Sequence, residues 1–169
     1  MVYLRIRMAN IETSPDKIDE LLSRGVEDCF VREDLKKELL SGRQRRIKFG
    51  IDPTGPKIHI GRAIPLRKLR QFQLLGHQIV LIIGDFTAQI GDPSDKLAKR
   101  PMLTREVIEE NMRDYKAQIG KIIDTDKVEF VYNSDWLRQH GIQEICQLAE
   151  SFTVQQMIAR RNFLEKIKK

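Results

Sequence analysis

The chain has 169 residues, of which 41% are hydrophobic and 32% are charged, and its formal net charge is +6 at pH 7. This length supports one well-buried domain and excludes two large ones. The composition is ordinary for a globular protein, and no apolar run approaches the roughly 18 to 20 residues that a membrane span needs. The positive charge is compatible with a polyanionic partner, although many proteins without such a partner carry as much.

The cysteine and histidine content indicates the cellular compartment rather than a metal site. The two cysteines, Cys29 and Cys146, lie far apart in helix-like segments, and we expect buried free thiols in a reducing cytosol. The segment 1–8 is short and mixed in composition, so we expect no signal peptide there. We therefore expect a cytoplasmic protein. His77 and His140 stand beside turn glycines, and we expect both at the surface.

The first 43 residues predict a helical amino-terminal arm. Residues 1–15 have no clear period. A helix begins at Pro15 and continues to about Cys29, because its apolar residues recur at helical spacing. A second helix runs from about Arg32 to Leu40, with Gly42 as its C-cap. We expect this arm to pack on the core, and the alternative is a face that binds a partner.

Residues 44–169 predict an α/β domain with a Rossmann-like parallel sheet and flanking helices. Three apolar runs are typical of buried strands, and helical periods lie between them. One such period begins at the N-cap Thr104 and continues to about Ile119. Strand and helix alternation of this kind predicts three layers. The predicted strands are 47–51, 79–83 and 128–132.

A turn and a helix follow the first strand, at residues 52–62. Such a junction presents free backbone N–H groups and the positive end of a helix dipole, which suits a phosphate. Gly61 has no Cβ, so a nucleotide could lie directly on the backbone, and His59 and Arg62 could donate to phosphate oxygens. Pro65 fits this interpretation only if the helix starts close to Gly61, because proline is tolerated in a first turn and not later.

The carboxyl ends of parallel strands meet at one edge of a sheet, where ligands bind. Residues 85–100 follow the second strand at this edge, and Asn133 follows the third. Taken alone, Asp92 is interpreted as a turn residue, while Lys96 and Arg100 are either phosphate ligands or solvated loop residues. Trp136 is interpreted as a packing residue.

Several segments carry a resemblance to a known family. His59-Ile60-Gly61-Arg62 resembles the HIGH signature of class I aminoacyl-tRNA synthetases. Together with this signature, three longer runs look like a bacterial tyrosyl-tRNA synthetase: GIDPTGPKIHIG (50–61), KLRQFQLLGH (68–77) and LIIGDFTAQIGDPSDK (81–96). The resemblance implies the first, incomplete half of a Rossmann-like catalytic domain in residues 44–169. It also implies ATP-dependent activation of L-tyrosine and its transfer to tRNA(Tyr).

The resemblance also implies the residues of the site. His59 and Arg62 would be catalytic, and Thr87, Asp92 and Asn133 would bind tyrosine. ATP would be a substrate, and Mg2+ is expected to bind together with ATP rather than to dedicated protein ligands. No tightly bound cofactor is expected. Family members are homodimers, with an interface expected here at about 142–162. The implied ATP-binding residues are Gly50, Asp52, Thr54, His59, Gly61, Arg62, Lys96 and Arg100.

Three departures from the family pattern reduce the expected activity. Arg62 replaces the second His of HIGH, Lys48 stands where many relatives have a tyrosine that meets the substrate phenol, and the chain has no K-M-S-K-S segment. We therefore expect either a fragment of a longer enzyme or a naturally shortened one, with weak activity or none.

Two alternatives remain open from the sequence. A small nucleotidyltransferase also uses an H-x-G-H helix start to bind ATP, but the loop containing Ile90-Gly91-Asp92-Pro93-Ser94 argues against it. The other alternative is a non-catalytic paralogue that binds nucleotide, RNA or a protein partner. Arg62 and the missing lysine loop favour this second alternative.

Overall fold

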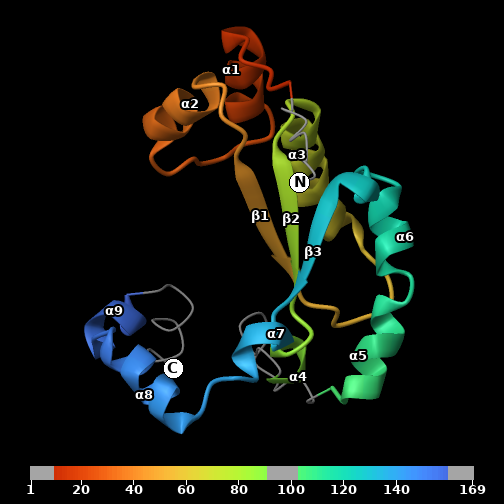
Figure 1. The fold of residues 1–169 in the computed structure, drawn as a ribbon, viewed down its shortest axis with the longest axis vertical. Helices are drawn as coiled ribbons and strands as arrows, with labels where there is room; N and C mark the ends of the chain where they lie inside the picture. Colours follow the sequence, from red (N-terminus) through yellow and green to blue (C-terminus); the bar gives the residue numbers. More distant parts are fainter. Residues whose placement is uncertain (1–9, 91–102, 160–169) are drawn as a thin grey trace, which may run out of the picture.

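A computed structural model of the chain describes residues 10–90 and 103–159. Its centre is a parallel sheet with the strand order β1-β2-β3 (Figure 1). Ile47 pairs with Ile79, and Ile79 pairs in turn with Val128. The predicted Rossmann-like α/β fold and its parallel pairing are confirmed, and each predicted strand is correct to within one residue. The strands are β1 (Arg46–Ile51), β2 (Gln78–Ile83) and β3 (Val128–Tyr132).

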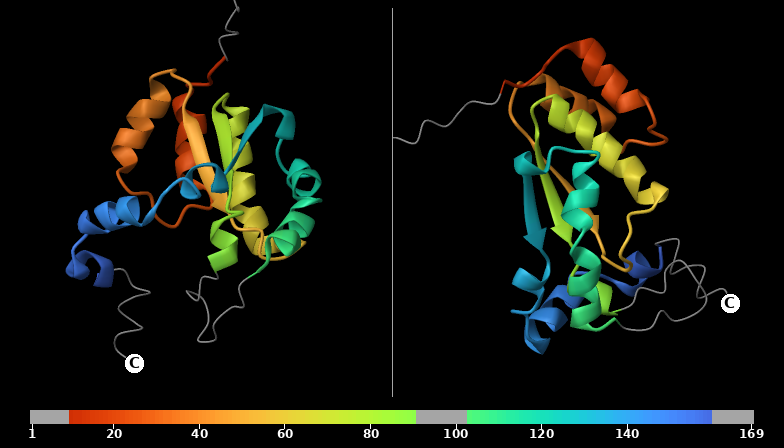
Figure 2. Two further views of the ribbon diagram at one scale, coloured as in Figure 1. Left: turned by 60° about the horizontal axis from the view of Figure 1, so that its bottom comes forward. Right: turned by 90° about the vertical axis from the view of Figure 1, so that its right-hand side faces the viewer.

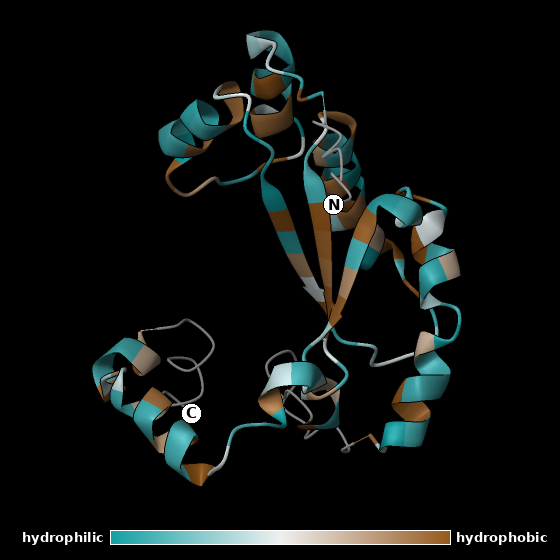
Figure 3. Cartoon of the chain, viewed as in Figure 1, coloured by the Kyte–Doolittle hydropathy of each residue, from teal (hydrophilic) through white to brown (hydrophobic). Residues whose placement is uncertain are grey.

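Of the helices that connect the strands, α3 and α6 pack on one face of the sheet (Figure 2, right). Strand β2 is hydrophobic along most of its length (Figure 3), as expected for the central strand of a parallel sheet. The connecting helices are α3 (Ile60–Leu74), α4 (Thr87–Ile90), α5 (Arg105–Met112) and α6 (Tyr115–Gly120), followed by a short 3-10 turn (Thr125–Lys127). The core between sheet and helices contains Ile51, Leu66, Leu69, Ile79, Leu81, Tyr115, Ile119 and Ile123.

The opposite face of the sheet is open in the described part of the chain. It borders a cavity of about 410 Å³ that has an apolar floor and charged residues at its margin. Three layers were predicted. Residues 10–90 and 103–159 form two of them, the sheet and the helices on one of its faces. The lining residues are Arg46, Lys48, Val80, Ile82, Glu129, Val131 and Trp136.

The amino-terminal arm packs on the core, as predicted. Helices α1 (Pro15–Ser23) and α2 (Arg32–Leu40) contact each other and the end of α3 (Figure 1). Helix α1 ends earlier than expected, because Gly25 adopts a left-handed φ of +66° that a continuing helix does not allow. The buried contacts are Ile18, Leu21, Leu22, Leu39 and Leu75.

Two other helix predictions need correction. The helix expected from Thr104 to about Ile119 is two helices, α5 and α6, because Asp114 has φ −98° and ψ 0°, outside regular helical values. Helix α3 begins at Ile60, close to Gly61 as expected, but it continues through Pro65, which is its sixth residue and lies beyond the first turn. The missing proline N–H leaves the carbonyl group of Gly61 without its helical partner.

The last helices carry exposed apolar side chains. They are α7 (Ser134–Leu137), α8 (Ile142–Glu150) and α9 (Val154–Ile158). Ile142 is 83% exposed and Leu148 is 65% exposed. The predicted helix 142–150 is confirmed, whereas the helix predicted from Thr153 to Lys169 is described only as far as α9.

Both cysteines are free, as predicted, but neither is fully buried: Cys29 is half-buried, and Cys146 is exposed because it lies on α8, none of whose residues is buried. His77 was expected at the surface and is instead buried, with 3% of its area exposed, because Phe72 lies beside its ring and residues 10–12 of the arm lie against the adjoining Leu75 and Gly76. None of the helices in residues 10–90 and 103–159 combines the length and apolarity needed to cross a membrane.

Candidate active site

Three polar side chains from different strand ends contact one another at the carboxyl edge of the sheet. The hydroxyl of Thr87 donates to Oδ1 of Asp52 at 2.8 Å and accepts from Nδ2 of Asn133 at 2.9 Å. The amide oxygen of Asn133 accepts from the backbone N–H of Phe86 at 2.9 Å, and this side chain is buried. The structure therefore brings together one predicted ATP residue and two predicted tyrosine residues.

Gly84 makes room for this network. A Cβ atom at this position would lie 1.7 Å from Oδ1 of Asp52 and 2.5 Å from Oγ1 of Thr87, far inside van der Waals contact. The N–H of Gly84 also donates to the carbonyl of Ile51 at 2.9 Å. A side chain at this position would therefore force the carboxylate of Asp52 or the backbone to move. Gly84 was not among the site residues predicted from the sequence.

The turn between β1 and α3, residues 53–58, is fixed by one face of the α5–α6 segment. Asn111 donates to the carbonyl of Pro53 at 3.0 Å, and Gln118 donates to that of Pro56 and accepts from the N–H of Ile58, both at 2.8 Å. Tyr115 donates to the carbonyl of Gly55 at 2.8 Å. We call Asn111, Tyr115 and Gln118 the turn clamp. Sequence reasoning missed all three, although their spacing of four and three residues is that of one helical face.

His59 and Gly61 lie together at the start of α3. His59 occupies the N-cap position and is exposed, and its carbonyl accepts from the N–H of Arg62 at 2.9 Å. Its imidazole lies over Gly61, with Cε1 and Nδ1 each 3.1 Å from the place of a Cβ atom. The side chain of His59 makes no capping hydrogen bond, so the first turn of the helix retains N–H groups for an anion.

Arg62 is directed toward the turn. Its Nη1 donates to the hydroxyl of Tyr115 at 2.6 Å and its Nη2 donates to Oγ1 of Thr54 at 2.9 Å. A guanidinium group has five N–H donors, so these two bonds leave further donors on the same side chain. Burial raises the pKa of the Tyr115 phenol, while the neighbouring Arg62 lowers it in part. The phenol is therefore protonated at neutral pH and donates to Gly55.

The remaining predicted site residues fall into two groups. Gly50 lies on β1 at the open face, where a Cβ atom would be 4.0 Å from the carbonyl oxygen of Ile82. Asp92, Lys96 and Arg100 lie outside the described residues. Within 10–90 and 103–159, no group of three or more His, Cys, Asp or Glu side chains is placed to hold a metal ion.

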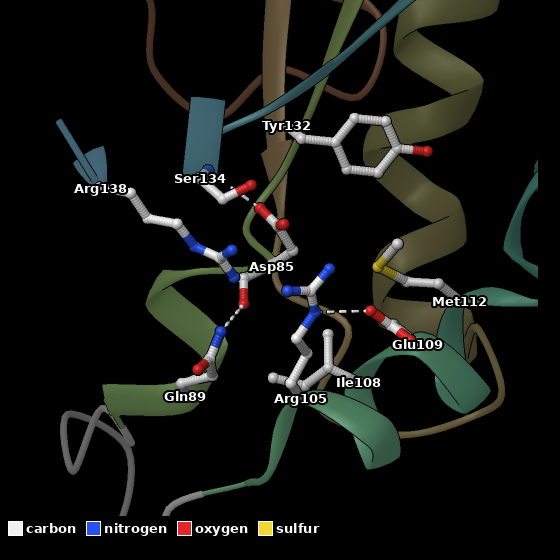
Figure 4. A pocket seen from close by; sticks show the side chains of 9 residues that line it. All are labelled: Asp85, Gln89, Arg105, Ile108, Glu109, Met112, Tyr132, Ser134 and Arg138. Atoms are coloured by element: carbon white, nitrogen blue, oxygen red, sulfur yellow. Dashed lines mark hydrogen bonds and ion pairs between the residues drawn. The ribbon is translucent and has the colours of Figure 1, made fainter. Parts of the chain in front are cut away.

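A second, polar cavity of about 170 Å³ lies between α4, α5 and α7 (Figure 4). Nε of Arg105 donates to Glu109 at 2.6 Å, and the carboxylate of Asp85 accepts from the N–H of Ser134 at 3.0 Å. Charges of both signs line this cavity, and Arg105 and Glu109 are paired with each other. The other lining residues are Gln89, Ile108, Met112, Tyr132 and Arg138.

Comparison with known proteins places the chain among the class I synthetases. Residues 40–169 match the family model for tRNA synthetases class I (W and Y). A tyrosine–tRNA ligase of Dehalococcoides mccartyi (strain CBDB1) is 49% identical over 153 residues, covering 90% of this chain and 39% of the relative. The enzyme of Haemophilus ducreyi is 46% identical over 142 residues, covering 84% of this chain and 36% of the relative. The chain thus spans well under half the length of these relatives.

Solved structures share the fold at low sequence identity. A truncated mitochondrial tyrosyl-tRNA synthetase of Coccidioides posadasii superposes with a TM-score of 0.69 at 21% identity, covering 90% of this chain and 45% of that one. The Archaeoglobus fulgidus enzyme complexed with L-tyrosine has a TM-score of 0.64 at 22% identity, covering 87% and 45%. The resemblance to tyrosyl-tRNA synthetases is confirmed, and the chain belongs to the class I tRNA synthetase family of the W and Y type.

Proposed function

We propose that this chain is the ATP- and tyrosine-binding portion of a tyrosine–tRNA ligase. The observation that carries the proposal is the contact among Asp52, Thr87 and Asn133 at the carboxyl edge of the sheet. Asp52, the turn at residues 53–58 and the start of α3 all come directly after strand β1 in the chain. The family match favours this function over a small nucleotidyltransferase.

In the proposed complex, the start of α3 binds the phosphates of ATP. His59, the backbone of Gly61 and the remaining donors of Arg62 would neutralise phosphate oxygens, while Gly50, Asp52 and Thr54 would contact the rest of the nucleotide. Lys96 and Arg100 are proposed as further phosphate ligands. Mg2+ would enter with ATP, coordinated mainly by phosphates and water.

L-Tyrosine would lie beside the network. Thr87, Asn133 and Asp92 are proposed to hold its polar end. The cavity on the open sheet face offers an apolar floor of Val80, Ile82 and Val131, and its volume is within the range of small-ligand sites. In this arrangement the ammonium group of Lys48, at the margin of the same cavity, would donate to the phenol oxygen.

The first reaction step needs position and charge rather than a protein nucleophile. The tyrosine carboxylate attacks the α-phosphate of ATP, the bond to the β-phosphate oxygen breaks, and pyrophosphate leaves. The second step would transfer the tyrosyl group to tRNA(Tyr), in the cytoplasm. Because the sequence has no K-M-S-K-S segment, we propose that the isolated chain binds ATP weakly and forms little adenylate. Each missing transition-state donor costs on the order of 10²–10³ in rate.

Calorimetric titration of ATP with Mg2+ into the chain and into Gly61→Val tests the assigned site. We expect at least about a tenfold loss of affinity in the variant, because a side chain there displaces His59 and blocks close approach of the phosphate. Gly120→Val is the matched control, since Gly120 is exposed and lies at the end of α6. Equal affinity of the wild type and Gly61→Val would refute the site. Tyrosine-dependent pyrophosphate exchange at ordinary enzymatic rates would refute the proposed incompleteness.

We also propose that α8 and α9 form a contact between two copies of the chain. The apolar side chains of Ile142, Leu148 and Phe152 are more than half exposed, and burial of such a surface in a symmetric dimer is favourable. Sedimentation should show a dimer at high micromolar concentration, and Leu148→Glu should shift it to monomer. A wild-type chain that stays monomeric at that concentration contradicts this contact.

A further inference from the structure

The phenol oxygen of Tyr115 connects the hydrophobic core to the turn at the proposed ATP site. The ring of Tyr115 is 3% exposed and belongs to the core between the sheet and the helices. Its hydroxyl donates to the carbonyl of Gly55 at 2.8 Å and accepts from Nη1 of Arg62 at 2.6 Å. One buried atom therefore contacts both the turn and the first helical turn of α3.

Arg62 extends this connection to a second point of the turn. Nη2 donates to Oγ1 of Thr54 at 2.9 Å, and the N–H of Thr54 donates to the carbonyl of Asp52 at 2.9 Å. The two terminal nitrogens of one planar guanidinium group thus bond to Tyr115 and to Thr54 at the same time. This geometry requires two donors on rigidly spaced atoms.

The residue at position 62 decides whether this connection exists. Histidine, the residue that the resembled signature has at this position, carries a shorter side chain with its two nitrogens in a small ring. It cannot reproduce the paired donors that Arg62 directs to two different residues. Tyr115 and Arg62 therefore act as a pair in this chain.

We propose that Tyr115 is a positioning residue that acts through Arg62 to hold the 53–58 turn in the geometry that binds ATP. This inference rests on the proposed function of the α3 start. It assigns to the buried tyrosine a role beyond packing, and it explains how an arginine is accommodated at the fourth position of the signature. Tyr115 itself does not contact the nucleotide.

A double-mutant cycle on the full 169-residue chain tests the pair. Tyr115→Phe removes the hydroxyl and keeps the ring in the core. We expect it to weaken ATP binding about tenfold when position 62 is Arg, since a hydrogen bond to a charged group is lost. In the Arg62→His background we expect a change below about twofold, because the partner is already absent. Tyr132→Phe, an exposed tyrosine, is the control for the substitution itself.

A second pair of variants tests the other end of the connection. Thr54→Val removes the oxygen that accepts from Nη2. Because Thr54 is also proposed to contact the nucleotide, the test is the difference between backgrounds: Thr54→Val should weaken binding more with Arg62 than with Arg62→His, and Thr54→Ser should restore binding with Arg62. If Tyr115 acts only through its bond to Gly55, Tyr115→Phe weakens ATP binding equally with Arg62 and with Arg62→His. This result would overturn the proposal. No loss in either background would overturn it as well.

Hydrogen exchange provides a readout that does not depend on ATP. The backbone N–H groups of Thr54 and Ile58 are hydrogen-bonded in the folded turn. Tyr115→Phe should accelerate the exchange of these two amides about tenfold when position 62 is Arg, and should leave it unchanged when position 62 is His. If the wild-type chain fails to bind ATP, the proposed function fails, and the exchange rates still decide whether Tyr115 acts through Arg62. Unchanged rates in the Arg62 background would overturn the proposal.

Discussion

The two ends of the same three strands satisfy their polar groups in different ways. At the amino end, Nδ1 of buried His77 accepts from the backbone N–H of Arg45 at 3.3 Å, and Gln44 donates to the carbonyl of Gly76 at 2.9 Å. At the carboxyl end, the side chains of Asp52, Thr87 and Asn133 bond to one another. The buried side chain of His77 at the amino end bonds to the backbone, and the side-chain pair of Arg46 and Glu129 there is exposed. The carboxyl end instead has a network of three connected side chains.

This difference separates stability from binding. A backbone partner at the amino end is fixed by the strand and by the arm that covers it, so its exchange for a ligand would break the fold. A side-chain partner at the carboxyl end can rotate, and Asp52 is already exposed to solvent. Substitutions at the amino end should therefore change stability alone, whereas substitutions at the carboxyl end should change ATP binding too.

The largest effect is expected for Gly84→Ala at the carboxyl end. The added Cβ would lie 1.7 Å from Oδ1 of Asp52, so either this carboxylate or the backbone must move. We expect a loss of about 1–3 kcal/mol in the free energy of unfolding, together with weaker ATP binding. Urea denaturation and calorimetric titration measure the two quantities.

Gly120→Ala is the control for Gly84→Ala. A Cβ atom at Gly120 would meet its nearest neighbour, Cγ2 of Thr125, at 3.6 Å, an ordinary contact. We expect no loss of stability and unchanged ATP binding, because alanine favours the helix over glycine. If Gly84→Ala behaves like Gly120→Ala, the network does not depend on the space at Gly84.

A smaller effect is expected from the titration of His77 at the amino end. Burial lowers the pKa of His77 below its ordinary value of 6.5, and the neighbouring Arg45 lowers it further. The unfolded chain therefore binds a proton at a higher pH than the folded chain. Stability should decrease as the pH falls below about 6.5 and become constant once the folded histidine is also protonated. Urea denaturation between about pH 7.5 and 5 measures this dependence.

His77→Gln provides the comparison for the pH series. Glutamine keeps an acceptor for the N–H of Arg45 but does not titrate. We expect this variant to lose the part of the pH dependence below about pH 6.5 and to bind ATP as the wild type does. An identical pH dependence in both proteins would exclude His77 as its source, and weaker ATP binding would contradict the separation of the two ends.

Local patterns allowed most of the fold to be predicted. Alternation in Ile47, Phe49 and Ile51, and continuous apolarity in residues 79–83, predict strands because burial on a sheet face imposes those periods. His59, Gly61 and Thr87 were identified because they follow strands or resemble a known signature. Each of these signals lies within a few residues of the feature that it predicts.

Features that depend on contacts between distant residues could not be predicted from the sequence in the same way. The turn clamp residue Asn111 bonds to Pro53, 58 positions away, and no local pattern shows which turn its helix will meet. His77 appeared exposed because it follows Gly76, yet Phe72 lies beside its ring and the arm lies against Gly76. The sequence around Gly84 does not show that this residue needs to be glycine, because the reason is the nearby side chain of Asp52 from another strand end.

Amide chemical-shift mapping with ATP and Mg2+ shows whether the carboxyl edge beside α3 is the nucleotide site. We predict that titration shifts the resonances of Thr54, Gly61 and Arg62 and leaves those of the amino end, including His77, unchanged. The polar cavity is the competing location, because it also carries arginine side chains. Shifts confined to Arg105, Ser134 and Arg138, with none at Gly61, would contradict the assignment of the site.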